Sequence, residues 1–205
     1  MHSKQYLGYD LPEALSGEEL ERLTAQFVST VGARIRELRK MQGLSTRAIW
    51  KRHRIRPSQF SRVESGKSNL TAWTAVRFAY VLGVRPWDFY VPREDAPSLK
   101  PKQHEHPLPP KAELEGATTA FRQQIGKRIR ALRTLQGMSA DELAEFSGIA
   151  PAMIVNLEAG RVNLRASTAI RIADAIGVLP HELFIPRELS GIRPRTTDAE
   201  RSDDA

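Results

Sequence analysis

Cysteine is absent from this chain of 205 residues, which excludes a disulfide framework, a thiolate metal site and a cysteine nucleophile. No apolar run approaches the roughly 20 residues that a membrane-spanning helix needs, and the first residues lack the apolar core of a signal peptide. A Gly-rich phosphate loop, a metal-spaced cluster and a nucleophile motif are missing as well. We therefore expect a cytoplasmic protein that is not an enzyme and that needs no cofactor, metal or membrane.

Negative charge is the scarcer sign, with 24 Asp and Glu against 31 Lys and Arg, which gives a net charge of +7. Hydrophobic residues make up 40% of the chain, enough to bury a core, although aromatic residues contribute only 7%. An excess of positive charge favours an anionic partner, of which nucleic acid is the simplest.

An internal repeat organises the chain. Residues 27–94 align without a gap on residues 121–188, and 27 of the 68 aligned positions are identical. Two copies at a fixed offset of 94 residues indicate a tandem of small domains, because a solenoid needs more copies of a shorter unit.

The segments outside the two copies are polar, and each has its own signal. Ser16 and Glu19 fit a capping box that opens a helix near residue 17. The segment between the copies is rich in proline, and its His104 and His106 lack a third metal ligand. The sequence therefore predicts an N-terminal arm with a short helix (1–26), a first domain (27–94), a proline-rich linker (95–113), a second domain (114–188) and a disordered tail (189–205).

Each copy has apolar residues at helical spacing and residues typical of helix starts and ends. In the first copy Val31, Ile35 and Leu38 recur at helical intervals. Glycine ends, serine or threonine caps and proline starts then follow at Gly43, Ser45, Pro57, Gly66, Thr71, Gly83 and Pro86. The second copy repeats six of these seven residues, at Gly137, Ser139, Pro151, Gly160, Gly177 and Pro180. We therefore predict an all-α protein made of two tandem five-helix domains.

The motifs of each copy resemble those of the Cro/C1-type (XRE-family) helix-turn-helix domain of bacterial and phage regulators. The resemblance covers both blocks of 68 residues and rests on Ile-Arg-x-Leu-Arg, Gly-x-Ser, Glu-x-Gly and an apolar-Gly-Val motif, in that order. It implies two lambda-repressor-like domains, in which the third helix enters the DNA major groove and the second crosses the backbone. It also implies a bacterial or phage-encoded protein of the cytoplasm, associated with the nucleoid.

The same resemblance implies an ion pair in each copy, between an arginine of the first helix and the glutamate that ends the third. These residues are Arg39 with Glu64, and Arg133 with Glu158. We interpret both pairs as scaffold rather than as base contacts. Breaking a partly buried pair of this kind from one side costs about 3–5 kcal/mol.

The excess charge belongs to one copy. Residues 27–94 hold 14 Lys and Arg against 4 Asp and Glu, a net +10, whereas residues 121–188 hold 9 against 7, a net +2. Because arginine can fork onto guanine and glutamine onto adenine, the third helix of the first copy offers candidate base readers. These are Arg56, Ser58, Gln59, Ser61 and Arg62. Candidate phosphate contacts flank this helix at Ser45, Thr46, Arg47, Lys51, Arg52, Arg54, Lys67, Ser68 and Asn69.

The matching helix of the second copy is apolar. Met153 and Val155 would add apolar surface in a DNA groove, which favours packing on protein over reading DNA. The DNA-contact candidates of this copy are therefore weaker ones: Asn156, Arg161, Asn163 and Arg165.

The first copy departs from the family template at its turn. Trp50 stands where the second copy has alanine, so we expect a wider spacing between the second and third helices or a rotation of one of them. Arg54 replaces a glycine of the second copy and must adopt a turn conformation that glycine favours. Trp73, beside Arg77, is a candidate for stacking on a base or anchoring a partner.

Three functions are consistent with these features. The leading hypothesis is a sequence-specific repressor that binds double-stranded DNA as a homodimer or larger oligomer, its two reading domains coming from two chains or from one. The alternative is a protein-interaction module, co-regulator or antitoxin-like, that binds a partner through Met153, Val155 and their neighbours. The third is binding of RNA or single strands through the basic and aromatic residues.

Overall fold

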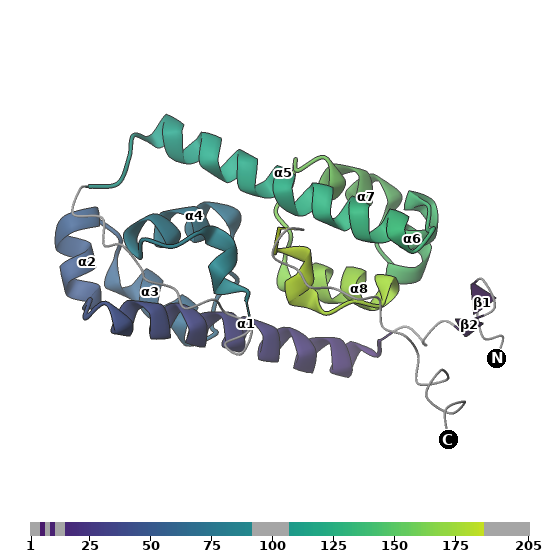
Figure 1. Cartoon of the computed structure of the whole chain (residues 1–205). Helices are drawn as coiled ribbons and strands as arrows, with labels where there is room; N and C mark the ends of the chain where they lie inside the picture. Colours follow the sequence, from purple (N-terminus) through teal and green to yellow (C-terminus); the bar gives the residue numbers. More distant parts are fainter. Residues whose placement is uncertain (1–4, 7–8, 11–14, 92–106, 187–205) are drawn as a thin grey trace, which may run out of the picture.

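The computed structural model describes residues 5–6, 9–10, 15–91 and 107–186 (Figure 1). The first domain comprises α1 (Gly17–Met41), α2 (Thr46–His53), α3 (Pro57–Glu64), α4 (Ala72–Val81) and the 3₁₀ helix η1 (Pro86–Phe89). The second repeats this order with α5 (Lys111–Leu135), α6 (Ala140–Ser147), α7 (Pro151–Glu158), α8 (Ala166–Ile176) and the 3₁₀ helix η2 (Pro180–Leu183). Near the N-terminus, β1 (Gln5–Tyr6) pairs antiparallel with β2 (Tyr9–Asp10). The prediction of an all-α fold with two helix-turn-helix domains in tandem is confirmed.

Apart from the two long helices α1 and α5, the helices begin and end where the local sequence predicts. The Ser45 hydroxyl accepts the N–H of Ala48 at 3.0 Å and so caps α2, while Pro57 is the first residue of α3. Gly66, the second residue after α3, has a φ of +69°, the left-handed conformation that glycine adopts without strain. None of the helices in the described part of the chain is long and apolar enough to cross a membrane.

The first helix of each domain is longer than the sequence predicts. The short helix expected in the N-terminal arm is instead the first part of α1, because no proline interrupts the segment that Ser16 opens. The linker is expected to reach residue 113, yet α5 begins at Lys111, directly after two prolines. Residues 92–106, which include the predicted linker residues 95–106 with both histidines, and residues 187–205, which include the predicted tail, lie outside the described residues.

The apolar core runs through both domains as one cluster, to which each domain contributes an equivalent part. In the first domain the Phe60 ring of α3 stacks on the Phe78 ring of α4, with centroids 3.8 Å apart and planes 3° from parallel. The second domain has Ile154 and Ile172 at the same two positions, and all four side chains are fully buried. The core therefore fixes α3 on α4 and α7 on α8, with the opposite face of each third helix toward solvent.

The two domains also pack on each other. Helix α1 runs along one side of the molecule and lies against α8, while α5 runs along the other side and lies against α4 (Figure 1). Each long helix thus belongs to its own domain at its C-terminal half and covers the other domain with its N-terminal half.

Candidate nucleic-acid interface

Helix α3 presents the candidate base readers to solvent. Its Phe60 and Val63 are buried and face the core. Four of the five candidates are exposed, namely Arg56, Ser58, Ser61 and Arg62, and Gln59 is half-buried. Within the described part of the chain, none of these side chains has a hydrogen bond or an ion pair. Their donors and acceptors are therefore available to another molecule, as base reading requires.

A glycine sets the depth at which α3 lies against α1. A Cβ added at Gly32 would lie 2.3 Å from the carbonyl oxygen of Val63 and 3.2 Å from that of Glu64, so no side chain fits there. The second domain repeats the contact, because a Cβ at Gly126 would lie 2.4 Å from the carbonyl oxygens of Leu157 and Glu158. Neither glycine is among the functional residues that the sequence predicts. The available signal is a glycine at the same mid-helix position of both copies.

A forked ion pair ties the end of α3 to α1. Arg39 donates from Nε to Glu64 Oε1 at 2.5 Å and from Nη2 to Oε2 at 2.9 Å, and its Nη1 donates to the Leu44 carbonyl at 2.7 Å. The hydrogen bonds to Glu64 raise the pKa of Arg39, against the opposing effect of burial. Because both partners are engaged with each other within the domain, this pair fixes the end of α3 to α1.

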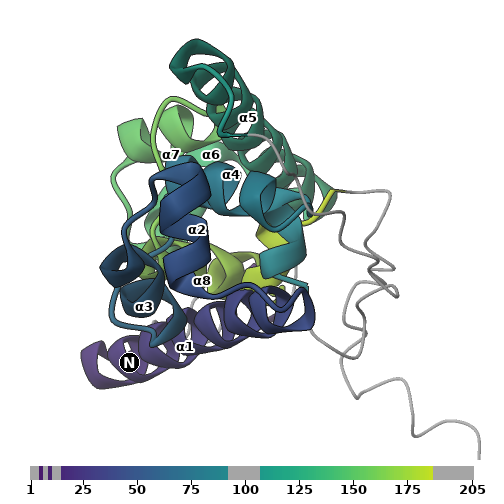
Figure 2. The same ribbon diagram turned by 90° about the vertical axis from the view of Figure 1, so that its left-hand side faces the viewer.

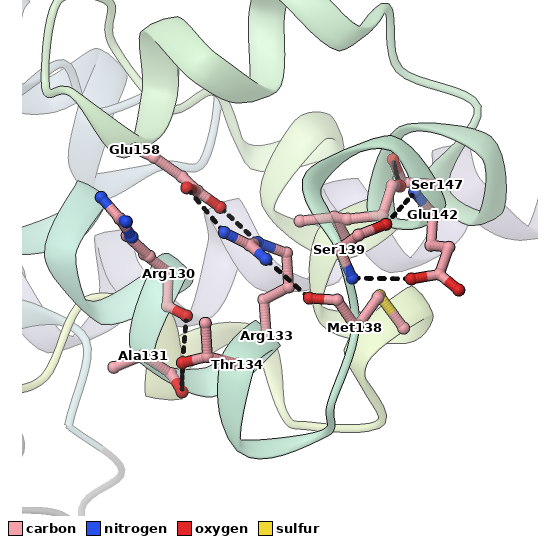
Figure 3. A network of polar contacts seen from close by, with 10 residues as sticks. Arg130, Ala131, Arg133, Thr134, Met138, Ser139, Glu142, Ser147 and Glu158 are labelled. Atoms are coloured by element: carbon pink, nitrogen blue, oxygen red, sulfur yellow. Dashed lines mark hydrogen bonds and ion pairs between the residues drawn. The ribbon is translucent and has the colours of Figure 1, made fainter. Parts of the chain in front are cut away.

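The second domain holds α7 with the same device. Figure 3 shows Arg133 forked onto Glu158, at 2.6 Å from Nε and 3.0 Å from Nη2, with Nη1 donating to the Met138 carbonyl at 2.6 Å. Ser139 and Glu142 form the reciprocal cap that opens α6. The two third helices therefore have equivalent supports, and the domains differ in what these helices present to solvent.

The turn between α2 and α3 takes the strained form that the sequence predicts. Arg54 has a φ of +56°, and its guanidinium carbon lies 5.8 Å from the centroid of the Trp50 ring. Trp50 is 38% exposed, whereas Ala144, at the equivalent position of α6, is buried. Helix α6 lies against α8, whereas the equivalent helix α2 has few contacts with α4. The expectation that the indole widens or rotates the packing of α2 on α3 stays a prediction.

The candidate phosphate contacts lie on both sides of α3. Most of them are exposed, namely Ser45, Arg47, Lys51, Arg52, Arg54, Lys67 and Asn69, while Thr46 and Ser68 are half-buried. The Ser45 hydroxyl oxygen serves as the cap of α2. None of the cations in this set forms an ion pair within the described part of the chain. The positive charge around α3 is therefore not neutralised by the protein itself.

Two of these cations also line a cleft away from the third helix. The cleft, of about 470 Å³, lies between α2, α4 and the start of α5, and it brings Arg52 and Arg54 together with Arg77. The Arg77 guanidinium carbon lies 5.8 Å from the centroid of the half-buried Trp73 ring, and burial lowers the pKa of Arg77. Stacking of Trp73 on a base stays a prediction.

Helix α7 presents a different surface from α3. Met153 is 43% exposed and Val155 is 52% exposed. Asn156 accepts a hydrogen bond from Arg161 at 3.3 Å, so its carbonyl oxygen already has a partner. Asn163 lies between the domains, where its Oδ1 accepts the Ala72 N–H at 3.4 Å, whereas Arg161 and Arg165 are exposed. The prediction that the apolar surface of α7 packs on protein rather than on DNA stays a prediction.

Comparison with known proteins finds the same unit twice. A helix-turn-helix domain model matches residues 30–87, and a helix-turn-helix model matches residues 129–183. Among solved structures, the restriction-modification controller protein C.AhdI from Aeromonas hydrophila is 34% identical over 32% of this chain and 98% of that chain, with a TM-score of 0.31. No curated protein gives a match.

Proposed function

Since this chain belongs to the XRE family of helix-turn-helix DNA-binding transcriptional regulators, we propose that it reads its operator with α3 and represses transcription. The observation that supports the proposal is the combination of accessible polar side chains and firm support in α3. Its candidate base readers are exposed or, for Gln59, half-buried, and their side chains have no partner within the described part of the chain, while Phe60, Val63 and Glu64 fix α3 to the rest of the domain. A rigid helix with unpaired donors and acceptors is suited to base readout.

The charge of the first domain supports the same assignment. The net charge of residues 27–94 is +10, against +2 for residues 121–188, so the long-range attraction to DNA is concentrated around α3. The cations of α2 and of the loop after α3 supply the phosphate contacts that set register, and Arg56, Gln59 and Arg62 supply the base contacts. Repression then follows from occupancy, when the bound site overlaps a promoter.

Selection from a library of random 30-base-pair duplexes at moderate salt tests this proposal. We expect a defined motif for the full chain. A bidentate arginine contact contributes about 1–3 kcal/mol of discrimination, so Arg62→Ala should weaken binding to that motif about 5- to 150-fold. Arg130→Ala, which removes the same charge from an exposed position of α5, is the matched control and should cost far less. Equal losses for both variants would reduce α3 to a non-specific charge contact.

Transcription in vitro distinguishes repression from activation. The selected motif is placed over the core of a promoter and, in a second template, upstream of it. We expect transcript yield from the first template to fall as protein is added, and the second template to be little affected. A rise in yield from either template would replace the repressor with an activator.

The alternative function, a protein-interaction module, depends on the exposed Met153 and Val155 of α7. The duplex selection tests it as well, because a module whose DNA binding is lost enriches no motif. A regulator with α3 as reader also needs two reading units. We propose that these are either two chains in a homodimer or the two domains of one chain.

A further inference from the structure

The interface between the two domains has the form of a dimer interface within one chain. Helix α1 lies against α8, and the equivalent helix α5 lies against α4, the equivalent of α8 (Figure 1). Each of these contacts therefore joins the first helix of one domain to the fourth helix of the other domain. A reciprocal contact of this kind is the mark of an isologous, two-fold interface.

Aromatic rings at equivalent positions meet at the centre of this interface. Tyr90 and Phe184, which are 94 residues apart, stack with centroids 3.9 Å apart and planes 2° from parallel. Around this pair, the ring centroid of Phe27 in the first domain lies 5.9 Å from that of Phe184, and the ring centroid of its counterpart Phe121 lies 6.5 Å from that of Tyr90. Tyr90, Phe121 and Phe184 are buried, and burial raises the pKa of Tyr90. Each domain therefore fills the apolar site that a second copy of the chain would otherwise fill.

The repeat itself extends into the segments that make this contact. Helices α1 and α5 are both 25 residues long, and their first residues are 94 positions apart. Leu20 and Thr24 of α1 correspond to Leu114 and Thr118 of α5, the latter two buried against the first domain. The faces that join two reading domains are thus already used within one chain.

We infer that a single chain is the DNA-binding unit, and that it binds a non-palindromic duplex site of two unequal halves. This inference rests on the proposed function. Helices α3 and α7 both lie at the left of the view in Figure 2, and they lie in the left and right halves of the molecule in Figure 1, so they share one side of the molecule and are set apart along it. The interface fixes their separation, and two half-sites on one face of B-DNA lie about 34 Å apart, one helical turn.

The two halves of the site differ because the two helices differ. Helix α3 specifies its half-site through unpaired arginine, glutamine and serine side chains. Helix α7 offers Met153 and Val155, which can contact a thymine methyl group, while the exposed Arg161 and Arg165 reach phosphates. The second half-site therefore contributes affinity and position but tolerates many sequences.

The wild-type chain gives the first test. Light scattering should find one chain in free solution at micromolar concentration and one chain per duplex in the complex. Selection from the random 30-base-pair library should return one strongly specified half-site and a weakly specified stretch one helical turn away. Two chains per duplex, or a selected inverted repeat, would overturn this inference and leave the proposed function intact. Absence of any enriched motif would overturn the proposed function itself, and this inference with it.

A graft on α7 gives the second test, because it should change the shape of the selected motif. The exposed readers of α3 are transferred to the equivalent positions by Ala150→Arg, Ala152→Ser, Met153→Gln, Val155→Ser and Asn156→Arg. The grafted chain should select an inverted repeat of the first half-site, still with one chain per duplex. It should bind that repeat at least about tenfold more tightly than wild type does, since one added bidentate contact is worth roughly that factor.

A matched control separates added readers from lost apolar surface. Met153→Ala with Val155→Ala trims α7 without adding donors, and it should leave the selected motif unchanged. Circular dichroism checks that both variants keep the helix content of wild type. A folded graft that selects the same motif as wild type would show that α7 does not face DNA, and would overturn the inference.

Discussion

Replacing Gly32 by alanine is expected to displace α3 from its contact with α1. The added Cβ would lie 2.3 Å from the Val63 carbonyl oxygen, and real Cβ contacts are essentially never shorter than 3.0 Å, so the backbones of α1 and α3 must separate by at least 0.7 Å. Overpacking of this kind costs about 1–3 kcal/mol, and here the obstacle is backbone rather than a flexible side chain. Alanine returns up to about 1 kcal/mol of helix propensity, which leaves a net loss of up to about 2 kcal/mol.

Urea denaturation followed by circular dichroism measures this loss. Gly116→Ala is the matched control, because Gly116 lies in α5 with no atom within 4 Å of an added Cβ. The control should gain about 0.5–1 kcal/mol in the free energy of unfolding, since it keeps the propensity benefit and meets no obstacle. The two alanine variants should therefore move stability in opposite directions. Equal gains for both would refute the close approach of α3 to α1 and the role assigned to Gly32.

Three further outcomes are expected from the ion pair, the domain interface and the surface charge. Arg39→Ala leaves the nearly buried Glu64 carboxylate unpaired and should lower the free energy of unfolding in urea by about 3–5 kcal/mol, whereas Lys111→Ala, which breaks an exposed pair with Glu115, should cost less than about 1 kcal/mol. Burial, with repulsion from Glu19, raises the pKa of Asp174, so the native state binds this proton more tightly than the unfolded state and gains stability as pH falls through the titration of the carboxyl group. Asp174→Asn should therefore raise Tm at neutral pH and remove this component from the dependence of Tm on pH; an unchanged profile would contradict the burial of Asp174 against α1. Fluorescence anisotropy at a series of salt concentrations should show DNA affinity falling steeply with salt, and Lys67→Ala should reduce the log–log slope by about 1 if Lys67 contacts a phosphate.

The residues that typically start and end helices were enough to predict the order of helices in each domain. A serine or threonine cap, a proline at the first turn and a glycine after the last turn act within a few residues, and the structure has Ser45, Pro57 and Gly66 in those roles. The repeat doubled this information, since each mark recurs 94 residues later. The exposed polar face of α3 follows from the same helical spacing, because Phe60 and Val63 must face the core.

Contacts between distant segments were less accessible to the sequence. The position of Trp50 is one example, because the comparison with the alanine of the other copy does not show that the indole is partly exposed beside Arg54. Gly32 was overlooked because a glycine within a helix has no local role there. Its role depends on the carbonyl oxygens of α3, which come from residues more than 30 positions away.

The sequence by itself determined the number of domains, the class and order of their helices, and the concentration of positive charge in the first domain. These properties depend on short-range rules and on composition. Only the tertiary structure decided that α1 and α5 each cover the other domain, with Tyr90 stacked on Phe184 between them. Apolar periodicity shows that a helix face must be covered, but it does not show which segment covers it, because any apolar surface of suitable shape satisfies the hydrophobic effect.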